Sequence, residues 1–228
     1  MEIMTRDFGK VNVDESKIFN FPSGLFAFEE CRQFALLSPL GDGVYPMWLQ
    51  STENVTPCFI VFDPAIIDGA YKITLNSSEK KLLKIDDSSN VRCLSIAVVP
   101  EDYKKTTVNM KCPIVINSDE NLAAQVILPE KYEIRLPIYV ERSRGLGDVY
   151  KRQMLVVTRK TDESLTISDN IEITVLEIGK DRVKIGISAP KDVKIIRNEL
   201  RDAQDMNKES SQALPKAAME ALLGMKKD

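Results

Sequence analysis

The chain has 228 residues, of which 43% are hydrophobic and 29% are charged, so it is long enough for two small globular domains and is not a disordered polypeptide. Its net charge of -3 argues against a general polycation mechanism of nucleic-acid binding. Histidine is absent and none of the four cysteines lies in a C-x-x-C pair, which argues against zinc binding and against Ser-His or Cys-His catalysis. We therefore expect no enzymatic activity, no metal and no cofactor.

Charge is distributed unevenly along the chain. Residues 1–141 carry 14 Lys and Arg against 20 Asp and Glu, whereas residues 154–228 carry 13 of each. Charged residues interrupt the first ten positions, and no apolar run approaches the length of a membrane span. The cysteines are sparse, which fits buried thiols in a reducing compartment. We expect no signal peptide, no membrane partner and a cytoplasmic location.

Residues 1–141 consist of short strand-like runs separated by turn residues. The predicted strands are residues 18–21, 58–62, 91–99, 113–116 and 123–128. Several short strands at this spacing predict a compact antiparallel β-barrel. One or two helical turns are expected around residues 28–35. The acidic surplus of this region falls mainly in predicted loops and strand ends, where it either meets a cationic partner or forms a solvated face.

Residues 142–153 are rich in Arg and Gly and predict an exposed linker. A genuine fusion of two proteins and the joining of two neighbouring genes by a sequencing or assembly error are both consistent with this junction. After it, residues 154–160 and 190–197 each predict a strand that ends in cations. Two such strand ends could form an edge that binds phosphates and bases, or they could be amphipathic strands with solvated charges.

Alternating apolar residues at 171–175 and 183–187 predict a hairpin around residues 179–181. From about residue 198 to 210 the apolar residues recur at helical spacing, with Leu200, Ala203 and Met206 or Asn207 on one face. Pro215 and Gly224 predict the ends of a second helix. A helix this short needs a surface on which to bury its apolar stripe. The residues of that stripe, and our candidates for a docking site, are Leu214, Ala218, Ala221 and Leu222.

Residues 154–200 resemble the CsrA family of RNA-binding regulators. The matching motifs are M-L-V-V-T-R-K at 154–160, I-E-I-T-V-L at 171–176 and I-G-I-S-A-P-K-D-V-K-I-I-R-N-E-L at 185–200. Asp162 and Ser168 stand where glycine is common in that family. The resemblance implies an intertwined homodimer, in which the first strand of one chain lies beside the last strand of the other.

The same resemblance implies that the ligand is a GGA element in a hairpin loop of an mRNA leader. Each RNA site would combine residues from both chains of the dimer. The implied RNA-binding residues are Val157, Thr158, Arg159 and Lys160 from one chain, with Val193, Ile195, Arg197 and Leu200 from its partner.

Residues 1–141 resemble the FliW family of flagellar assembly factors. The matching motifs are F-P-S-G-L at 21–25, W-L-Q-S at 48–51 and T-V-N-M-K-C-P-I-V-I-N at 107–117, although Phe26-Ala27 replaces the usual Pro-Gly. The resemblance implies a barrel that binds flagellin and antagonises CsrA. In that system a C-terminal extension of CsrA is where the antagonist docks, which makes the helical segment 201–228 the candidate docking element. The alternative is that its apolar stripe packs within the CsrA-like dimer.

Together these features predict a mainly β protein with four parts. They are a FliW-like barrel (1–141), a linker (142–153), a strand-swapped, dimeric CsrA-like RNA-binding domain (154–200) and a C-terminal helical extension (201–228). The predicted function is translational repression through GGA elements, under the control of the chain's own antagonist, which docks within the chain or across the dimer. The alternative is a flagellin-binding assembly factor or chaperone that uses the CsrA-like part only for dimerisation.

Overall fold

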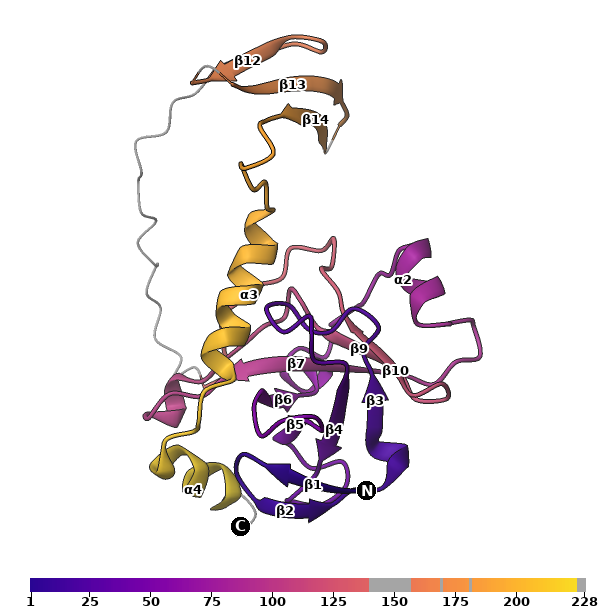
Figure 1. Ribbon diagram of the computed structural model, residues 1–228, viewed down its shortest axis with the longest axis vertical. Coiled ribbons are helices and arrows are strands. Elements are labelled where there is room, and N and C mark those ends of the chain that lie inside the picture. The colour runs from indigo at the N-terminus through magenta and orange to yellow at the C-terminus, as the bar shows by residue number, and fades with distance from the viewer. Residues whose placement is uncertain (140–156, 169, 181, 225–228) are drawn as a thin grey trace. The chain divides into compact units, whose positions relative to one another are not determined.

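The computed structural model describes residues 1–139, 157–168, 170–180 and 182–224 (Figure 1). They belong to two compact units. One combines Met1–Glu141 with Arg197–Asp228, and the other is Arg142–Ile196. The predicted linker at 142–153 and the first residues of the predicted 154–160 strand lie outside the described residues. The domain boundaries drawn from the sequence stay a prediction.

The first unit is built on a closed sheet with the strand order β7-β6-β5-β4-β3-β10-β9, in which β9 returns to pair with β7. These strands are β3 (Ile18–Asn20), β4 (Gln33–Leu37), β5 (Met47–Ser51), β6 (Cys58–Phe62), β7 (Val91–Val98), β9 (Ile114–Asn117) and β10 (Leu122–Gln125). The far end of β7 pairs with β8 (Thr107–Val108), which pairs with β11 (Leu136–Pro137). The result is a seven-stranded barrel with a two-stranded extension.

A hairpin and four short helical segments complete this part of the chain. They are β1 (Glu2–Thr5) with β2 (Gly9–Asn12), η1 (Glu15–Lys17), α1 (Pro64–Ile67), α2 (Ser77–Leu82) and η2 (Tyr103–Lys105). The β1–β2 hairpin places the turn residues Arg6 and Asp7 beside β5 and β6, because Arg6 bonds to the Cys58 carbonyl and Asp7 to the Trp48 indole.

Two predictions for this region are wrong in detail. The barrel is mixed and not purely antiparallel, because β10 runs parallel to β3, with Leu122 opposite Asn20. Hydrophobic periodicity identifies strands but carries no information on their direction, and a long connection permits parallel closure. The helix expected at 28–35 is also absent, since residues 33–37 form β4 and pair with β3 and β5 on either side. Pairing with two neighbouring strands outweighs the local helical pattern.

The central strands are buried on both faces. In β6, Phe59 belongs to the cluster inside the barrel, whereas its neighbour Ile60 belongs to a second cluster that includes Trp48. The second cluster is completed by two residues of the last helix, Ala218 and Leu222. A strand covered on both sides reads as a continuous apolar run without alternation, which is the pattern of residues 58–62.

The C-terminal part of the first unit is helical, as predicted. Helix α3 spans Asn198–Ser210 and α4 spans Lys216–Gly224. These bounds confirm the helix predicted at 198–210 and the roles of Pro215 and Gly224 as boundary residues. Helix α3, drawn in yellow in Figure 1, packs against β6 and β7.

The second unit contains a three-stranded antiparallel sheet of β12 (Ser164–Ile167), β13 (Ile171–Ile178) and β14 (Val183–Ser188). The hairpin predicted between β13 and β14 is confirmed. Neither residues 157–160 nor residues 190–197 form a strand, contrary to the sequence prediction. A strand exists only when its backbone groups pair with a neighbour, and in the single chain these two segments have no neighbouring strand in the described residues.

Several turns hold non-glycine residues in the left-handed region. Ala27, where the resembling family has glycine, has a φ of 70°, and Asp162 and Ser168 have φ values of 65° and 53°. The turns therefore keep the geometry that glycine would permit, at a steric cost. At Gly24 a larger residue would not fit without a backbone shift, because a Cβ there would lie 2.6 Å from Glu29 Cα.

Candidate functional site

The candidate site in the first unit is the surface on which α3 lies. The buried residues of α3 recur at helical spacing: Ala203, Met206, Asn207 and Ser210. This agrees with the face predicted from the sequence, and Asn207 is fully buried together with Met206. A polar amide on the buried face of a helix requires partners there, since burying it unpaired would cost free energy.

Asn207 finds those partners on the barrel. Its Nδ2 donates to Gln125 Oε1 at 2.7 Å and to the Phe26 carbonyl at 2.9 Å. Gln125 Nε2 in turn donates to the Cys112 carbonyl at 3.1 Å and lies 3.4 Å from Asn207 Oδ1. The two amides thus bond to each other in both directions, an arrangement that fixes both the position and the rotation of α3.

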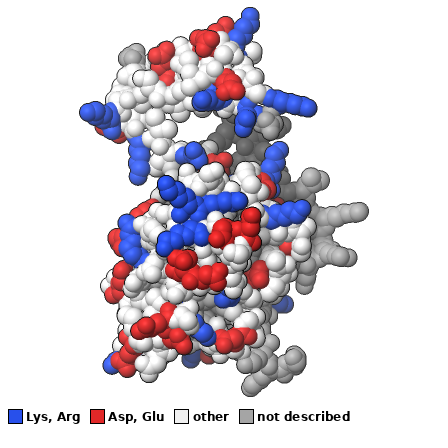
Figure 2. All heavy atoms as spheres, turned by 90° about the vertical axis from the view of Figure 1, so that its right-hand side faces the viewer, with Lys and Arg blue, Asp and Glu red and all other residues white. Residues whose placement is uncertain are grey.

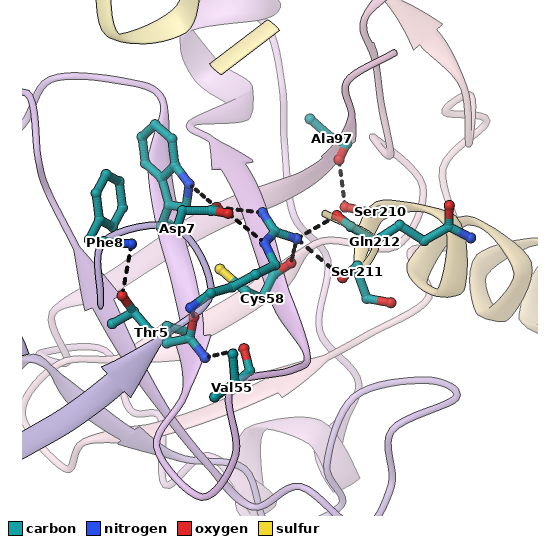
Figure 3. Close-up of polar contacts among 12 residues, drawn as sticks. Thr5, Asp7, Phe8, Val55, Cys58, Ala97, Ser210, Ser211 and Gln212 are labelled. Carbon is teal, nitrogen blue, oxygen red and sulfur yellow. Dashed lines mark hydrogen bonds and ion pairs between the residues drawn. The ribbon is translucent and has the colours of Figure 1, made fainter. Parts of the chain in front are cut away.

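Further polar contacts follow the same helix toward its C-terminal end. Ser210 Oγ donates to the Ala97 carbonyl of β7 at 2.6 Å (Figure 3). At the exposed edge, Arg135 pairs with Glu209 at 2.6 Å and Gln204 Nε2 donates to Glu29 Oε1 at 3.3 Å. The exposed ion pair adds little to stability, so the buried Ser210 bond is the more specific of these contacts.

The last contact is made by Arg6, from the turn between β1 and β2. Its Nη1 lies 2.8 Å from the Cys58 carbonyl, 3.1 Å from the Ser211 carbonyl and 2.6 Å from the Gln212 carbonyl (Figure 3). We call the barrel residues Arg6, Phe26, Cys58, Ala97 and Gln125 the helix-binding surface. Sequence reasoning missed Arg6 and Gln125, because nothing in the local pattern distinguishes them from other polar residues.

Helix α4 contributes apolar contacts. Ala218 and Leu222 are fully buried in the cluster that contains Trp48 and Ile60, and Leu214 packs against it partly buried. Ala221, the fourth candidate docking residue, is of intermediate burial. The predicted stripe therefore faces a surface of the first unit, with Leu222 and Ala218 at its centre.

Burial also sets the chemistry of nearby thiols. It raises the pKa of Cys58 to about 12, against the opposing effect of the Arg6 charge. It likewise raises the pKa of Cys112 to about 12, and the carboxylates of Glu199 and Asp202 on α3 act in the same direction. Both thiols stay protonated at neutral pH, so neither is an activated nucleophile.

The predicted RNA-binding residues divide between the two units. Arg197 and Leu200 belong to the first unit, and the other six belong to the second. Val157, Ile195 and the cations Arg159 and Lys160 are exposed, whereas Val193 is half-buried. Arg159 donates to the carbonyls of Ser164 and Thr158. The structure does not bring all eight residues into one site within a single unit.

Arg197 lies at the start of α3, where it is the N-cap residue. With Glu199 it lines a surface hollow of about 420 Å³ whose other walls come from the barrel: Thr74, Leu75, Asn76, Glu79, Lys111, Ile127, Leu128 and Pro129. On the face in Figure 2, acidic and basic side chains are interspersed.

The fold and this surface define a barrel that holds a helical segment, joined to a small β domain. The part of the chain that the structure describes contains no cluster of three or more His, Cys, Asp or Glu side chains suited to a metal. No helix among the described residues is long and apolar enough to cross a membrane.

The chain belongs to the FliW family, whose model matches residues 2–138. A second model, the CsrA global regulator protein family, matches residues 154–205. One chain therefore carries a FliW domain and a CsrA-family domain, which confirms both resemblances. Neither family is enzymatic, in agreement with the expectation that the chain catalyses no reaction.

Similar proteins cover the first domain almost completely. The flagellar assembly factor FliW of Natranaerobius thermophilus is 36% identical over 142 residues, which are 61% of this chain and 93% of that protein. FliW of Leptospira interrogans is 35% identical over 149 residues, 64% of this chain and 99% of that protein. A crystal structure of the flagellar assembly factor FliW superposes with a TM-score of 0.57 at 30% identity, covering 63% of this chain and all of the other.

Proposed function

We propose that this chain is a cytoplasmic post-transcriptional regulator that binds GGA elements in mRNA leaders and carries its own antagonist. The observation that supports this most directly is the contact between α3 and the barrel. Helix α3 begins inside the CsrA-family match at 154–205 and packs on the strands of the FliW domain. This contact supports an arrangement in which the barrel holds the extension of the proposed RNA-binding module of the same polypeptide.

The position of Arg197 supports a mechanism of inhibition. It immediately precedes α3 and shares a surface hollow with Glu79 and Lys111 of the barrel. An RNA phosphate or base that approaches Arg197 would have to share that space with the barrel, including the Glu79 carboxylate. Release of α3 would free the arginine for RNA. Because both domains are on one chain, their effective concentration is on the order of millimolar, which favours the held state.

We further propose that the RNA-binding form is a homodimer in which two chains exchange strands. The sheet of the second unit leaves Ile178, Val183 and Ile185 more than half exposed. Residues 157–160 and 190–197 are the segments that would pair with those of a partner chain. Each RNA site would then combine Val157, Thr158, Arg159 and Lys160 of one chain with Val193, Ile195, Arg197 and Leu200 of the other.

Flagellin is the proposed signal. The FliW relatives are named flagellar assembly factors, and a flagellin chain bound to the barrel would release the C-terminal helices and allow repression. A gel shift with a GGA hairpin tests this: the full chain should bind weakly, and added flagellin should strengthen binding. If no condition yields RNA binding, the alternative holds, in which the chain is a flagellin-binding assembly factor that dimerises through its CsrA-family part.

A further inference from the structure

Helix α3 ends with carbonyl groups that the helix cannot satisfy. The last carbonyls of any helix lack intrahelical partners. In a continued helix the Ser211 carbonyl would bond to the backbone nitrogen of residue 215, but that residue is Pro215, which has no N–H. The ends of helices also carry partial negative charge. The end of α3 therefore needs a donor, preferably a cationic one, from another part of the protein.

Arg6 supplies that donor. Its Nη1 reaches the Ser211 carbonyl at 3.1 Å and the Gln212 carbonyl at 2.6 Å. The Arg6 side chain is only 5% exposed, so these charge-assisted bonds are shielded from water. Among the described residues, they are the hydrogen bonds that join residues 211–212, the C-terminal flank of α3, to the barrel.

The guanidinium is also held by groups outside the C-terminal helices. Its Nε and Nη2 donate to the two carboxylate oxygens of Asp7 at 3.0 and 2.7 Å. The Trp48 indole donates to Asp7 Oδ2 at 2.9 Å, and the Arg6 backbone N–H donates to Gln50 Oε1 at 3.0 Å. None of these partners belongs to α3. These bonds preorganise the cation independently of its contacts with residues 211–212.

We propose that Arg6 is the residue of the helix-binding surface that recognises the end of the bound helix. The occupant for which the surface is built is residues 198–224 of this chain, in which the helix must stop four to five residues after the amide that pairs with Gln125. That spacing is the distance in sequence from Asn207 to Ser211 and Gln212. A helix that continues past this point presents no free carbonyl to Arg6 and is disfavoured. This inference deepens the proposed inhibition and rests on it for its biological meaning.

The test measures helix binding directly, by amide hydrogen exchange in the full chain. Arg6→Met keeps a long apolar side chain but removes every hydrogen-bond donor. Arg6→Lys keeps the positive charge but loses the planar guanidinium and its several fixed donors. We expect α3 amides to exchange about ten-fold faster or more in Arg6→Met, with Arg6→Lys in between, while β5 and β6 change less than about two-fold. If α3 keeps its protection within about two-fold of the parent while the barrel stays folded, the proposal is wrong.

A substitution next to α3 distinguishes recognition of the helix end from an effect on barrel stability. Pro215→Ala gives the Ser211 carbonyl a possible N–H partner and lets α3 continue. We expect it to accelerate α3 exchange several-fold when Arg6 is present and by less than about two-fold in the Arg6→Met background. Equal effects in both backgrounds would overturn the proposal.

If Arg6→Met unfolds the barrel, the same comparison is made in the Arg6→Lys background, where the effect of Pro215→Ala should shrink. An undiminished effect there would also overturn the proposal. Because exchange is read without RNA, a failure of the proposed RNA binding leaves this result interpretable.

Discussion

The barrel and the three-stranded sheet differ in how far their apolar side chains are buried within one chain. In the barrel, Trp48 and Phe59 are fully buried on opposite faces of adjacent strands, because the interior covers one face, and α4 and the β1–β2 hairpin cover the other. In the sheet, Ile185 and Val183 of the edge strand are 51% and 57% exposed. A unit of this size buries too little surface for independent stability. The barrel therefore completes its core within one chain, whereas the exposed apolar face of the sheet is consistent with the strand-exchanged dimer that we propose.

The largest expected effect follows from breaking the sheet's apolar face. Ile185 and Ile187 lie on one face of β14 opposite Val175 and Ile173, and Lys184 points to the other face. We expect the parent to have twice the 25.7 kDa chain mass by light scattering and Ile185→Asp to be a monomer with an unfolded second unit. Lys184→Asp, the matched control, should remain dimeric. A monomeric parent with an ordered sheet would contradict the proposed strand exchange.

The next largest effect concerns the covered face of the barrel. Leu222→Asp places a charge in a fully buried position, at a cost of about 3 kcal/mol or more. We expect α4 to detach, and affinity for a GGA hairpin to rise at least about ten-fold. Ala217→Asp on the exposed side of the same helix is the control and should change neither. Unchanged RNA affinity despite a detached α4 would show that the helix does not control access to RNA.

A substitution at Arg197 tests whether the start of α3 binds RNA. A guanidinium that loses a bidentate base contact costs about 1–3 kcal/mol. In the Leu222→Asp background, where the arginine is expected to be free, Arg197→Ala should weaken hairpin binding by about ten-fold or more. Arg201→Ala, an equally charged and exposed change on α3, should have a much smaller effect. Equal losses from the two changes would point to general electrostatics and not to a specific site.

The smallest effects are expected from substitutions that relieve backbone strain, one in each unit. Ala27 in the barrel and Ser168 in the sheet both have positive φ, which glycine adopts without steric cost. Ala27→Gly should stabilise the barrel by up to about 1 kcal/mol in denaturant unfolding. Ser168→Gly should stabilise the second unit by a similar amount, but with a midpoint that depends on protein concentration, because its folding is coupled to dimerisation. A midpoint independent of concentration would weaken that coupling.

Elements with a local sequence pattern could be predicted before the structure was known. Residues 58–62 and 198–210 were predicted at the bounds the structure shows. The short apolar run before Asp63-Pro64 indicates a buried strand by its length and its flanking turn residues, and the 3.6-residue period indicates a helix. The motifs also identified both families, and the apolar stripe of α4 indicated that it needed a surface.

Tertiary structure alone decided everything that depends on a neighbour distant in sequence. The parallel pairing of β3 with β10, the strand in place of the helix at 28–35 and the absence of strands at 157–160 and 190–197 all depend on which backbone groups are available to pair. The same holds for Arg6, whose partners at Ser211 and Gln212 lie more than 200 positions away. Hydrogen bonds of this kind leave no periodic trace in a sequence, since their geometry arises only when the folded chain brings the two ends together.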